Sequence, residues 1–287
     1  MIEKIESPPQ VFGTYVKFHE QLFKIHVQCM EHLIAVLPFE KLNQINIADR
    51  LLQRQSVLTS ADFIIDEKAL EFVFDLIFPI IKHYSYRYKE SIRRLEELYD
   101  KRKVSLRDLV STLLSGDASK VMEISTQYDI PAVLMQQVVE AIGAPYVELC
   151  AEFLNKKISR FDWREPTCPI CGNHPSMARV NEQSHNRWLW CRYCDTTWPF
   201  PEMTCPFCLS QDRKAIQLIF PSDKRPVRID ACNHCQHYLK TIDEMIDPEP
   251  VNMSVKHVAT FYLDLLAKSR GYHLPNHFQF YLDLMEF

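Results

Sequence analysis

Eight of the ten cysteines in the chain form four Cys-x-x-Cys pairs within one short stretch of sequence. The pairs are Cys168/Cys171, Cys191/Cys194, Cys205/Cys208 and Cys232/Cys235. The two thiolates of one pair can bind one face of a metal ion, and a second pair completes a tetrahedron. The four pairs therefore predict two metal sites, each held by four cysteine ligands.

The spacing of the pairs indicates how they group. The first two pairs are separated by 19 residues, the last two by 23, and the two couples by only 10. A ribbon closes over about 20 residues, which favours sequential over crossed pairing, although a crossed brace would use the same cysteines. Pro169, Gly172 and Pro206 supply the turn chemistry of rubredoxin-like or zinc-ribbon knuckles.

Other readings of the cysteines fit less well. The first residues lack the apolar segment and cleavage site of a secretory signal, so a reducing cytoplasm is expected and a disulfide framework is not. A thioredoxin-type centre would use a single pair beside a βαβ unit. Cys29 and Cys150 stand alone in apolar helical patterns and are expected to be buried. Four histidines near the pairs are surplus ligands, expected at the surface or around the sites: His174, His185, His234 and His237.

Closed four-thiolate sites leave no coordination position for water, which favours a structural or electron-carrying metal over a hydrolytic one. Iron and zinc both suit this donor set. The chain has only five glycines, and it lacks a nucleotide-binding fingerprint, a Gly-x-Ser-x-Gly elbow and a His-Glu-x-x-His helix. We therefore expect no catalytic residues, no further cofactor-binding residues and no enzymatic activity.

The remaining sequence predicts an α+β fold: an N-terminal α-helical lobe, two small knuckle modules with short strands, and a C-terminal helix. Apolar periodicity and capping signals predict a helix that follows Pro9 and runs through Val36, a helix from Ala69 to Tyr84 and a helix after Ser105. They also predict two helices, Ala132–Ala141 and Tyr146–Lys157, divided by a stop at Gly143. An Asp-Pro-Glu-Pro run at 247–250 predicts a stiff linker before a helix at 257–269, whose apolar stripe is expected to dock on the helical lobe. The expected units are residues 1–160, 161–200, 201–246 and 247–287.

Charge argues against nucleic acid as a partner. Residues 157–240 hold 12 Lys or Arg and 8 Asp or Glu, and two divalent ions bound by eight thiolates would cancel this excess. The whole chain has a formal charge of −4, so the concentrated basic surface that phosphates require is missing. The most apolar stretch, 72–81, contains Asp75 and Pro79, so no membrane insertion is expected.

The order of these motifs resembles the formate dehydrogenase accessory protein family FdhE. The resemblance rests on Cys-Pro-x-Cys-Gly at 168–172, Arg-Trp-Leu-Trp-Cys at 187–191, Trp198, the run from Cys232 to Lys240, and the segment from Val258 to Asn276. The resemblance is specific across about residues 167–276. Before them it is general, and consists only of a helical lobe of similar size. Three residues differ from those that are usual in the family: Leu209 replaces Gly, Met203 replaces Arg and Asp230 replaces Glu.

The resemblance implies a cytoplasmic maturation factor, or assembly chaperone, that is required for active formate dehydrogenase and binds its immature catalytic subunit. Iron is associated with some members of the family. A rubredoxin-like electron carrier is the alternative, and a nucleic-acid-binding zinc ribbon is a third hypothesis. The sequence leaves the metal, the partner-binding surface and self-association open.

Overall fold

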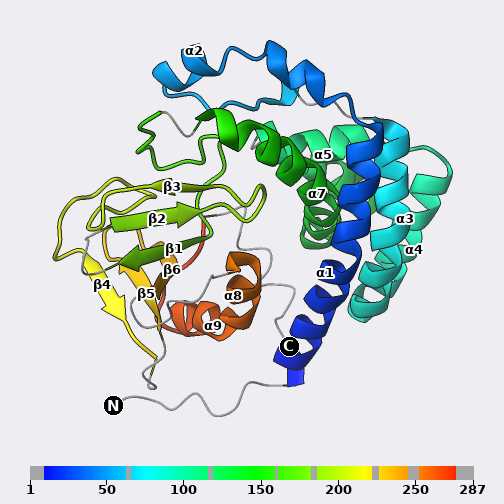
Figure 1. The fold of residues 1–287 in the computed structure, drawn as a ribbon. Coiled ribbons are helices and arrows are strands. Elements are labelled where there is room, and N and C mark those ends of the chain that lie inside the picture. The colour runs from blue at the N-terminus through cyan, green and yellow to red at the C-terminus, as the bar shows by residue number, and fades with distance from the viewer. Residues whose placement is uncertain are drawn as a thin grey trace.

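A computed structural model describes residues 10–62, 66–115, 119–158, 161–181, 186–221, 226–244 and 252–275 (Figure 1). It shows a helical lobe beside a mixed β-sheet, with two short helices near the C-terminal end of the chain. The α+β class, the N-terminal helices and the two cysteine knuckle clusters are confirmed. The expected linker at 247–250 lies outside the described residues.

The N-terminal lobe is built from seven described α-helices connected by short segments. They are α1 (Gln10–Val36), α2 (Ile47–Leu52), α3 (Glu67–Tyr84), α4 (Lys89–Asp100), α5 (Leu106–Ser115), α6 (Ser119–Tyr128) and α7 (Ala132–Ile158), with 3-10 helices at Phe39–Gln44, Ser60–Asp62 and Tyr86–Tyr88. Side chains cap two of these helices as the sequence predicts: the Asp66 carboxylate accepts from the Ala69 amide at 2.9 Å, and the Ser105 hydroxyl accepts from the Asp108 amide at 3.2 Å. Helix α7 contacts α1, α3, α5 and α6, so it forms the centre of the lobe.

The prediction of two helices divided at Gly143 is wrong. Helix α7 runs without interruption through Gly143 and Pro145. Gly143 faces α5, where a Cβ atom would overlap the side chain of Leu113 and meet Val110 at 3.0 Å. The glycine therefore serves close helix packing and does not end the helix, and burial of α7 outweighs the helix-breaking tendency of both residues.

One six-stranded sheet contains both expected knuckle modules. Its strands are β1 (Met177–Asn181), β2 (Asn186–Trp190), β3 (Thr197–Pro199), β4 (Ile216–Ile219), β5 (Val227–Cys232) and β6 (Tyr238–Asp243). The spatial order is β3-β2-β1-β6-β5-β4, with every neighbouring pair antiparallel except β1 and β6. The parallel β1–β6 pairing, in register Met177 to Lys240, joins the two halves. The expected module boundary at residue 200 stays a prediction.

Strands β1, β2 and β6 are buried on both faces: alternate side chains of a strand point to opposite faces, and each set packs in a core. Ala178, Leu189 and Leu239 belong to the core of the helical lobe. Their strand neighbours Met177, Trp190 and Tyr238 belong to a second core on the other face. The sheet therefore lies between the helical lobe and the C-terminal helices.

The C-terminal segment forms two helices, α8 (Met253–Ala259) and α9 (Phe261–Ser269), where the sequence predicts one. They are separated at Thr260, whose backbone is not helical. Helix α8 contacts α1, and α9 packs on β5 and β6. Phe261 reaches the helical lobe, with its ring 4.6 Å from that of Tyr15, whereas Leu263 is part of the core under the sheet. These helices thus connect the two lobes.

Candidate metal centres

The structure brings all eight paired cysteines together in two clusters. Site 1 contains Cys168, Cys171, Cys191 and Cys194; site 2 contains Cys205, Cys208, Cys232 and Cys235. Within each cluster the sulfur atoms all lie within 4.8 Å of one another. This is the sequential grouping that the spacing favours.

The distances between sulfurs suit a tetrahedral ion. The Sγ atoms of Cys168 and Cys194 are 3.4 Å apart in site 1, and those of Cys208 and Cys232 are 3.7 Å apart in site 2. Four sulfurs about 2.3 Å from a zinc ion at the centre of a tetrahedron would lie about 3.8 Å from each other. Each cluster could therefore hold one metal ion with little rearrangement.

All four Cys-x-x-Cys turns have the same backbone geometry. The amide of the first cysteine donates to the carbonyl five residues later, at 2.8 Å in the turns that begin at Cys168 and Cys232 and at 3.0 Å in those at Cys191 and Cys205. The residue after the second cysteine has a positive φ in every case: Gly172 (74°), Asp195 (52°), Leu209 (61°) and Gln236 (60°). Sequence reasoning found good turn chemistry only in the pairs with proline or glycine, yet the backbone repeats four times.

Gly172 is needed for two reasons. Its φ of 74° favours glycine, and a Cβ atom there would lie 3.0 Å from the Ser56 hydroxyl oxygen. The segment next to Ser56 pairs with the first knuckle, since the amides of Val57 and Leu58 donate to the carbonyls of Pro169 and Ile170 at 2.8 and 2.7 Å. The helical lobe thus directly supports site 1.

The two sites differ in exposure. All four cysteines of site 1 are at most 1% exposed, whereas Cys208 and Cys235 of site 2 are half-buried. Burial raises the pKa of Cys168, Cys191 and Cys194. Burial also opposes ionisation of Cys171, but hydrogen bonds from the three neighbouring thiols outweigh it and lower its pKa. A bound cation would be needed to ionise these four buried thiols together.

No histidine joins either cluster among the described residues. His174 and His237 lie beside site 2, with ring centroids 5.9 and 5.3 Å from that of Phe207. His234 is exposed, and His185 lies outside the described residues. The lone thiols of Cys29 and Cys150 are buried in the helical core, where burial raises their pKa to about 11 and about 12.

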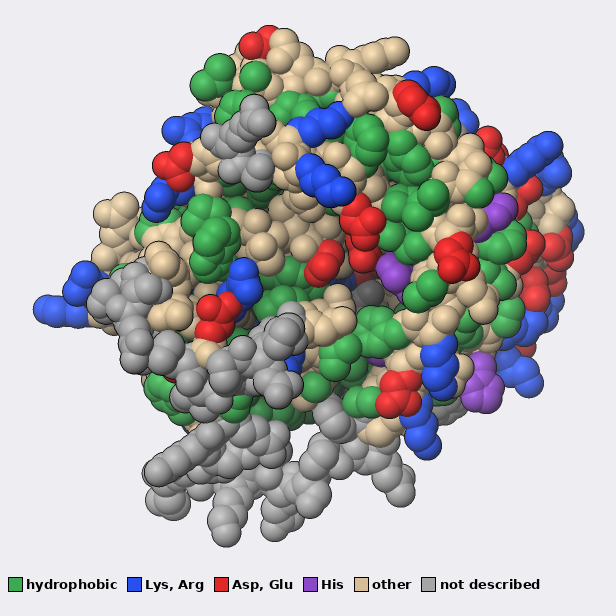
Figure 2. Space-filling view, viewed as in Figure 1, with side chains coloured by type: hydrophobic (Ala, Val, Ile, Leu, Met, Phe, Trp, Pro, Cys, Tyr) green, Lys and Arg blue, Asp and Glu red, His purple; other side chains and the backbone are tan. Residues whose placement is uncertain are grey.

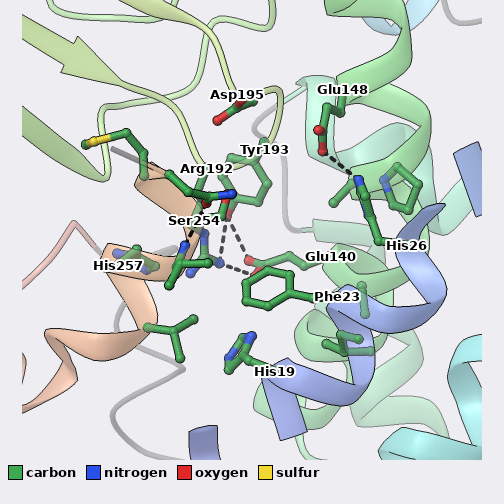
Figure 3. A pocket seen from close by; sticks show the side chains of 18 of the residues that line it. His19, Phe23, His26, Glu140, Glu148, Arg192, Tyr193, Asp195, Ser254 and His257 are labelled. Atoms are coloured by element: carbon green, nitrogen blue, oxygen red, sulfur yellow. Dashed lines mark hydrogen bonds and ion pairs between the residues drawn. The ribbon is translucent and has the colours of Figure 1, made fainter. Parts of the chain in front are cut away.

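Sequence reasoning missed the link between site 1 and the helical lobe. Arg192 and Tyr193, the two residues inside the second cysteine pair, both bind Glu140 of α7 (Figure 3). The Tyr193 hydroxyl donates to Glu140 at 2.8 Å, and Gln136 donates to the same carboxylate oxygen at 2.8 Å. Glu140 is 3% exposed. The available signal in the sequence was a glutamate among the apolar residues that surround position 140.

A second buried ionic network joins the two halves of the sheet. Asp230 of β5 lies 3.6 Å from the guanidinium of Arg187 on β2, accepts from Arg228 at 2.8 Å and accepts from the Thr241 hydroxyl at 2.8 Å. Arg187 also donates to the carbonyl of Thr204, just before site 2. Because the network bridges strands of both knuckle regions, it fixes one metal site relative to the other.

In the part of the chain that the structure describes, no helix is long and apolar enough to cross a membrane. No family model matches the chain.

Several curated proteins are similar in sequence. A protein FdhE homolog of Aquifex aeolicus is 23% identical over 230 residues, which are 79% of this chain and 75% of that protein. A homolog from Shewanella sp. is 30% identical over 122 residues, and the Escherichia coli protein FdhE is 22% identical over 169. These last two matches span 40% and 58% of this chain, and 39% and 51% of those proteins.

The crystal structure of the FdhE protein from Pseudomonas aeruginosa has the same fold. It superposes with a TM-score of 0.55 at 17% identity and covers 94% of this chain and 96% of its own. This chain is therefore similar to proteins named FdhE both in sequence and in fold.

Proposed function

We propose that this chain is a cytoplasmic accessory protein required for active formate dehydrogenase, and that it binds the immature catalytic subunit without oxidising formate itself. The homologues named FdhE support the accessory role. The Pseudomonas protein shares this fold over 94% of the chain, and that shared fold includes both lobes. Four cysteine ligands around one ion would leave no open coordination position for a substrate, which favours a binding function over a catalytic one.

The observation that carries the proposal is the pair of four-sulfur clusters within this fold. We infer that each cluster holds one iron or zinc ion through its four thiolates. The ion in site 1 would fix the turn that carries Arg192 and Tyr193, and with it the contact to Glu140. The metals would therefore keep the sheet and the helical lobe in the arrangement that contacts a partner.

A rubredoxin-like electron carrier is the second candidate, favoured by the exposure of site 2. Cys208 and Cys235 are half-buried, so an ion there would lie near the surface, where electrons could transfer to a partner. Iron would give visible sulfur-to-metal charge-transfer bands that bleach reversibly on reduction. A colourless zinc protein that still supports formate dehydrogenase would remove this candidate.

The test of the accessory role is complementation. In a strain lacking this protein, formate dehydrogenase activity is expected to fall and to return with the wild-type chain. It should not return with a variant in which the eight paired cysteines are serines, and that variant should fail to co-purify with the catalytic subunit. Cys29→Ala with Cys150→Ala is the matched control, because both thiols are buried outside the clusters. Full formate dehydrogenase activity without the protein would contradict the proposal.

A further inference from the structure

A cavity of about 670 Å³ lies where the helical lobe meets the sheet and α8 (Figure 3). Its walls come from α1, α7, the turn at 192–195 and α8. Pockets of about 300–1,000 Å³ are typical of ligand sites, and they often lie between structural units. In the space-filling view, acidic side chains and a histidine gather near the middle of the face, where these parts meet (Figure 2).

Three walls of this cavity present buried polar atoms for which the described residues supply no hydrogen-bond partner. They are Nε2 of His19 on α1, Oε1 of Gln137 on α7 and Nδ1 of His257 on α8. A buried polar group without a hydrogen-bond partner is destabilising, so such atoms favour a bound group that can satisfy them. Burial lowers the pKa of both histidines, and the nearby charges of Lys240 and Arg192 add to the effect. Each ring is therefore neutral and offers one donor and one acceptor nitrogen.

The cavity also has an apolar contact surface. The ring of Phe23 points into it and is 37% exposed, and Val255 on α8 is 48% exposed. Aromatic side chains in such positions are frequent anchors in protein–protein contacts. A polypeptide backbone carries N–H donors and C=O acceptors beside apolar side chains, so it matches both properties of the lining.

We propose that this cavity binds an extended segment of the formate dehydrogenase catalytic subunit, with an apolar side chain of the segment against Phe23 and its backbone against His19, Gln137 and His257. This inference rests on the proposed function. It further assigns a role to site 1, because Arg192 and Asp195, which line the cavity, lie within and just after the Cys191/Cys194 pair. A metal in site 1 would thus hold one wall of the binding cavity in place.

Phe72 provides a matched control for Phe23. It is also 37% exposed, but it lies on α3 and does not line the cavity. Its ring stacks on that of His32, with the ring centroids 3.8 Å apart. The experiment measures the affinity of the full-length, metal-loaded protein for the purified catalytic subunit. Phe23→Ala is expected to weaken binding at least tenfold, which is about 1.4 kcal/mol, and Phe72→Ala less than twofold.

Cross-linking gives a second measurement that does not depend on the stability of the alanine variants. The photoreactive residue benzoylphenylalanine replaces Phe23 or Phe72. Position 23 is expected to cross-link to one continuous segment of the catalytic subunit, and position 72 to none.

Three results would overturn the inference. If a complex forms but both alanine variants bind equally well and position 23 gives no cross-link, the cavity is not the binding site, although the proposed function stands. Cross-links from position 23 to a second copy of this chain would show that the cavity is a self-association surface. If the wild-type protein does not bind the catalytic subunit at all, the proposed function fails, and this inference with it.

Discussion

The contact between Glu140 and the turn at Arg192 and Tyr193 gives a sharp prediction about how the two lobes are joined. The side chains of Glu140 and Arg192 are only 4% and 13% exposed. Removing one partner of a buried ion pair costs about 3–5 kcal/mol, since the remaining charge stays out of water. Glu140→Ala also removes the acceptor of the Tyr193 hydroxyl. We therefore expect Glu140→Ala to lower the free energy of unfolding by about 3–5 kcal/mol.

The assay is urea unfolding of the full-length, metal-loaded protein, followed by circular dichroism. Glu96→Ala is the control. The carboxylate of Glu96 lies 2.8 Å from the ammonium group of Lys82, but both side chains are exposed, so this ion pair should contribute less than about 1 kcal/mol to the free energy of unfolding. The double variant Glu140→Ala/Arg192→Met should lose less than Glu140→Ala alone, since no buried charge is left without its partner. A loss for Glu140→Ala as small as that for Glu96→Ala would refute the reasoning.

Three further predictions concern single positions. Leu209→Gly should raise the free energy of unfolding by about 0.5–1 kcal/mol. The φ of 61° at this position strains a leucine by about 1–2 kcal/mol, and relief of that strain exceeds the cost of glycine's greater freedom in the unfolded chain. An unchanged or lower urea midpoint would contradict this. Gly143→Ala should destabilise the protein by about 1 kcal/mol, because the new Cβ overlaps Leu113. Gly13→Ala should stabilise it by a similar amount, because no atom lies within 4 Å of the new Cβ. Equal shifts in melting temperature would show that helix propensity alone determines the effect of both substitutions. Burial lowers the pKa of His19 from 6.5 to about 3, so below about pH 6.5 the unfolded chain binds a proton that the folded protein does not, and stability falls. Between pH 7 and pH 5, the free energy of unfolding of the wild type should fall by about 2 kcal/mol more than that of His19→Gln. Parallel pH profiles of the two proteins would count against this.

The metal clusters could be predicted from the sequence because their information is local. Each Cys-x-x-Cys pair is contained in one turn, and the 19- and 23-residue separations limit how the pairs combine. The helical lobe was predictable for a similar reason, since the caps at Asp66 and Ser105 act within one helical turn. The continuity of α7 was not, because packing of Gly143 against α5 depends on residues about 30 positions away.

The joining of the knuckles and lobes depends on contacts between distant residues. The parallel pairing of β1 with β6 links positions more than 60 residues apart, and no periodic pattern in the sequence predicts it. The same is true of the contact from Glu140 to Arg192 and Tyr193, which spans 52 and 53 residues. The cavity between the lobes follows from these contacts, so it could not be predicted before they were known.

The most direct test of the central claim is metal analysis of the full-length protein purified without oxygen. We expect two ions of iron or zinc per chain, falling to one when Cys171 and Cys191 are replaced by serine, and to one when Cys208 and Cys232 are replaced instead. A protein that contains no metal, stays folded after chelation and still supports formate dehydrogenase activity would contradict the account.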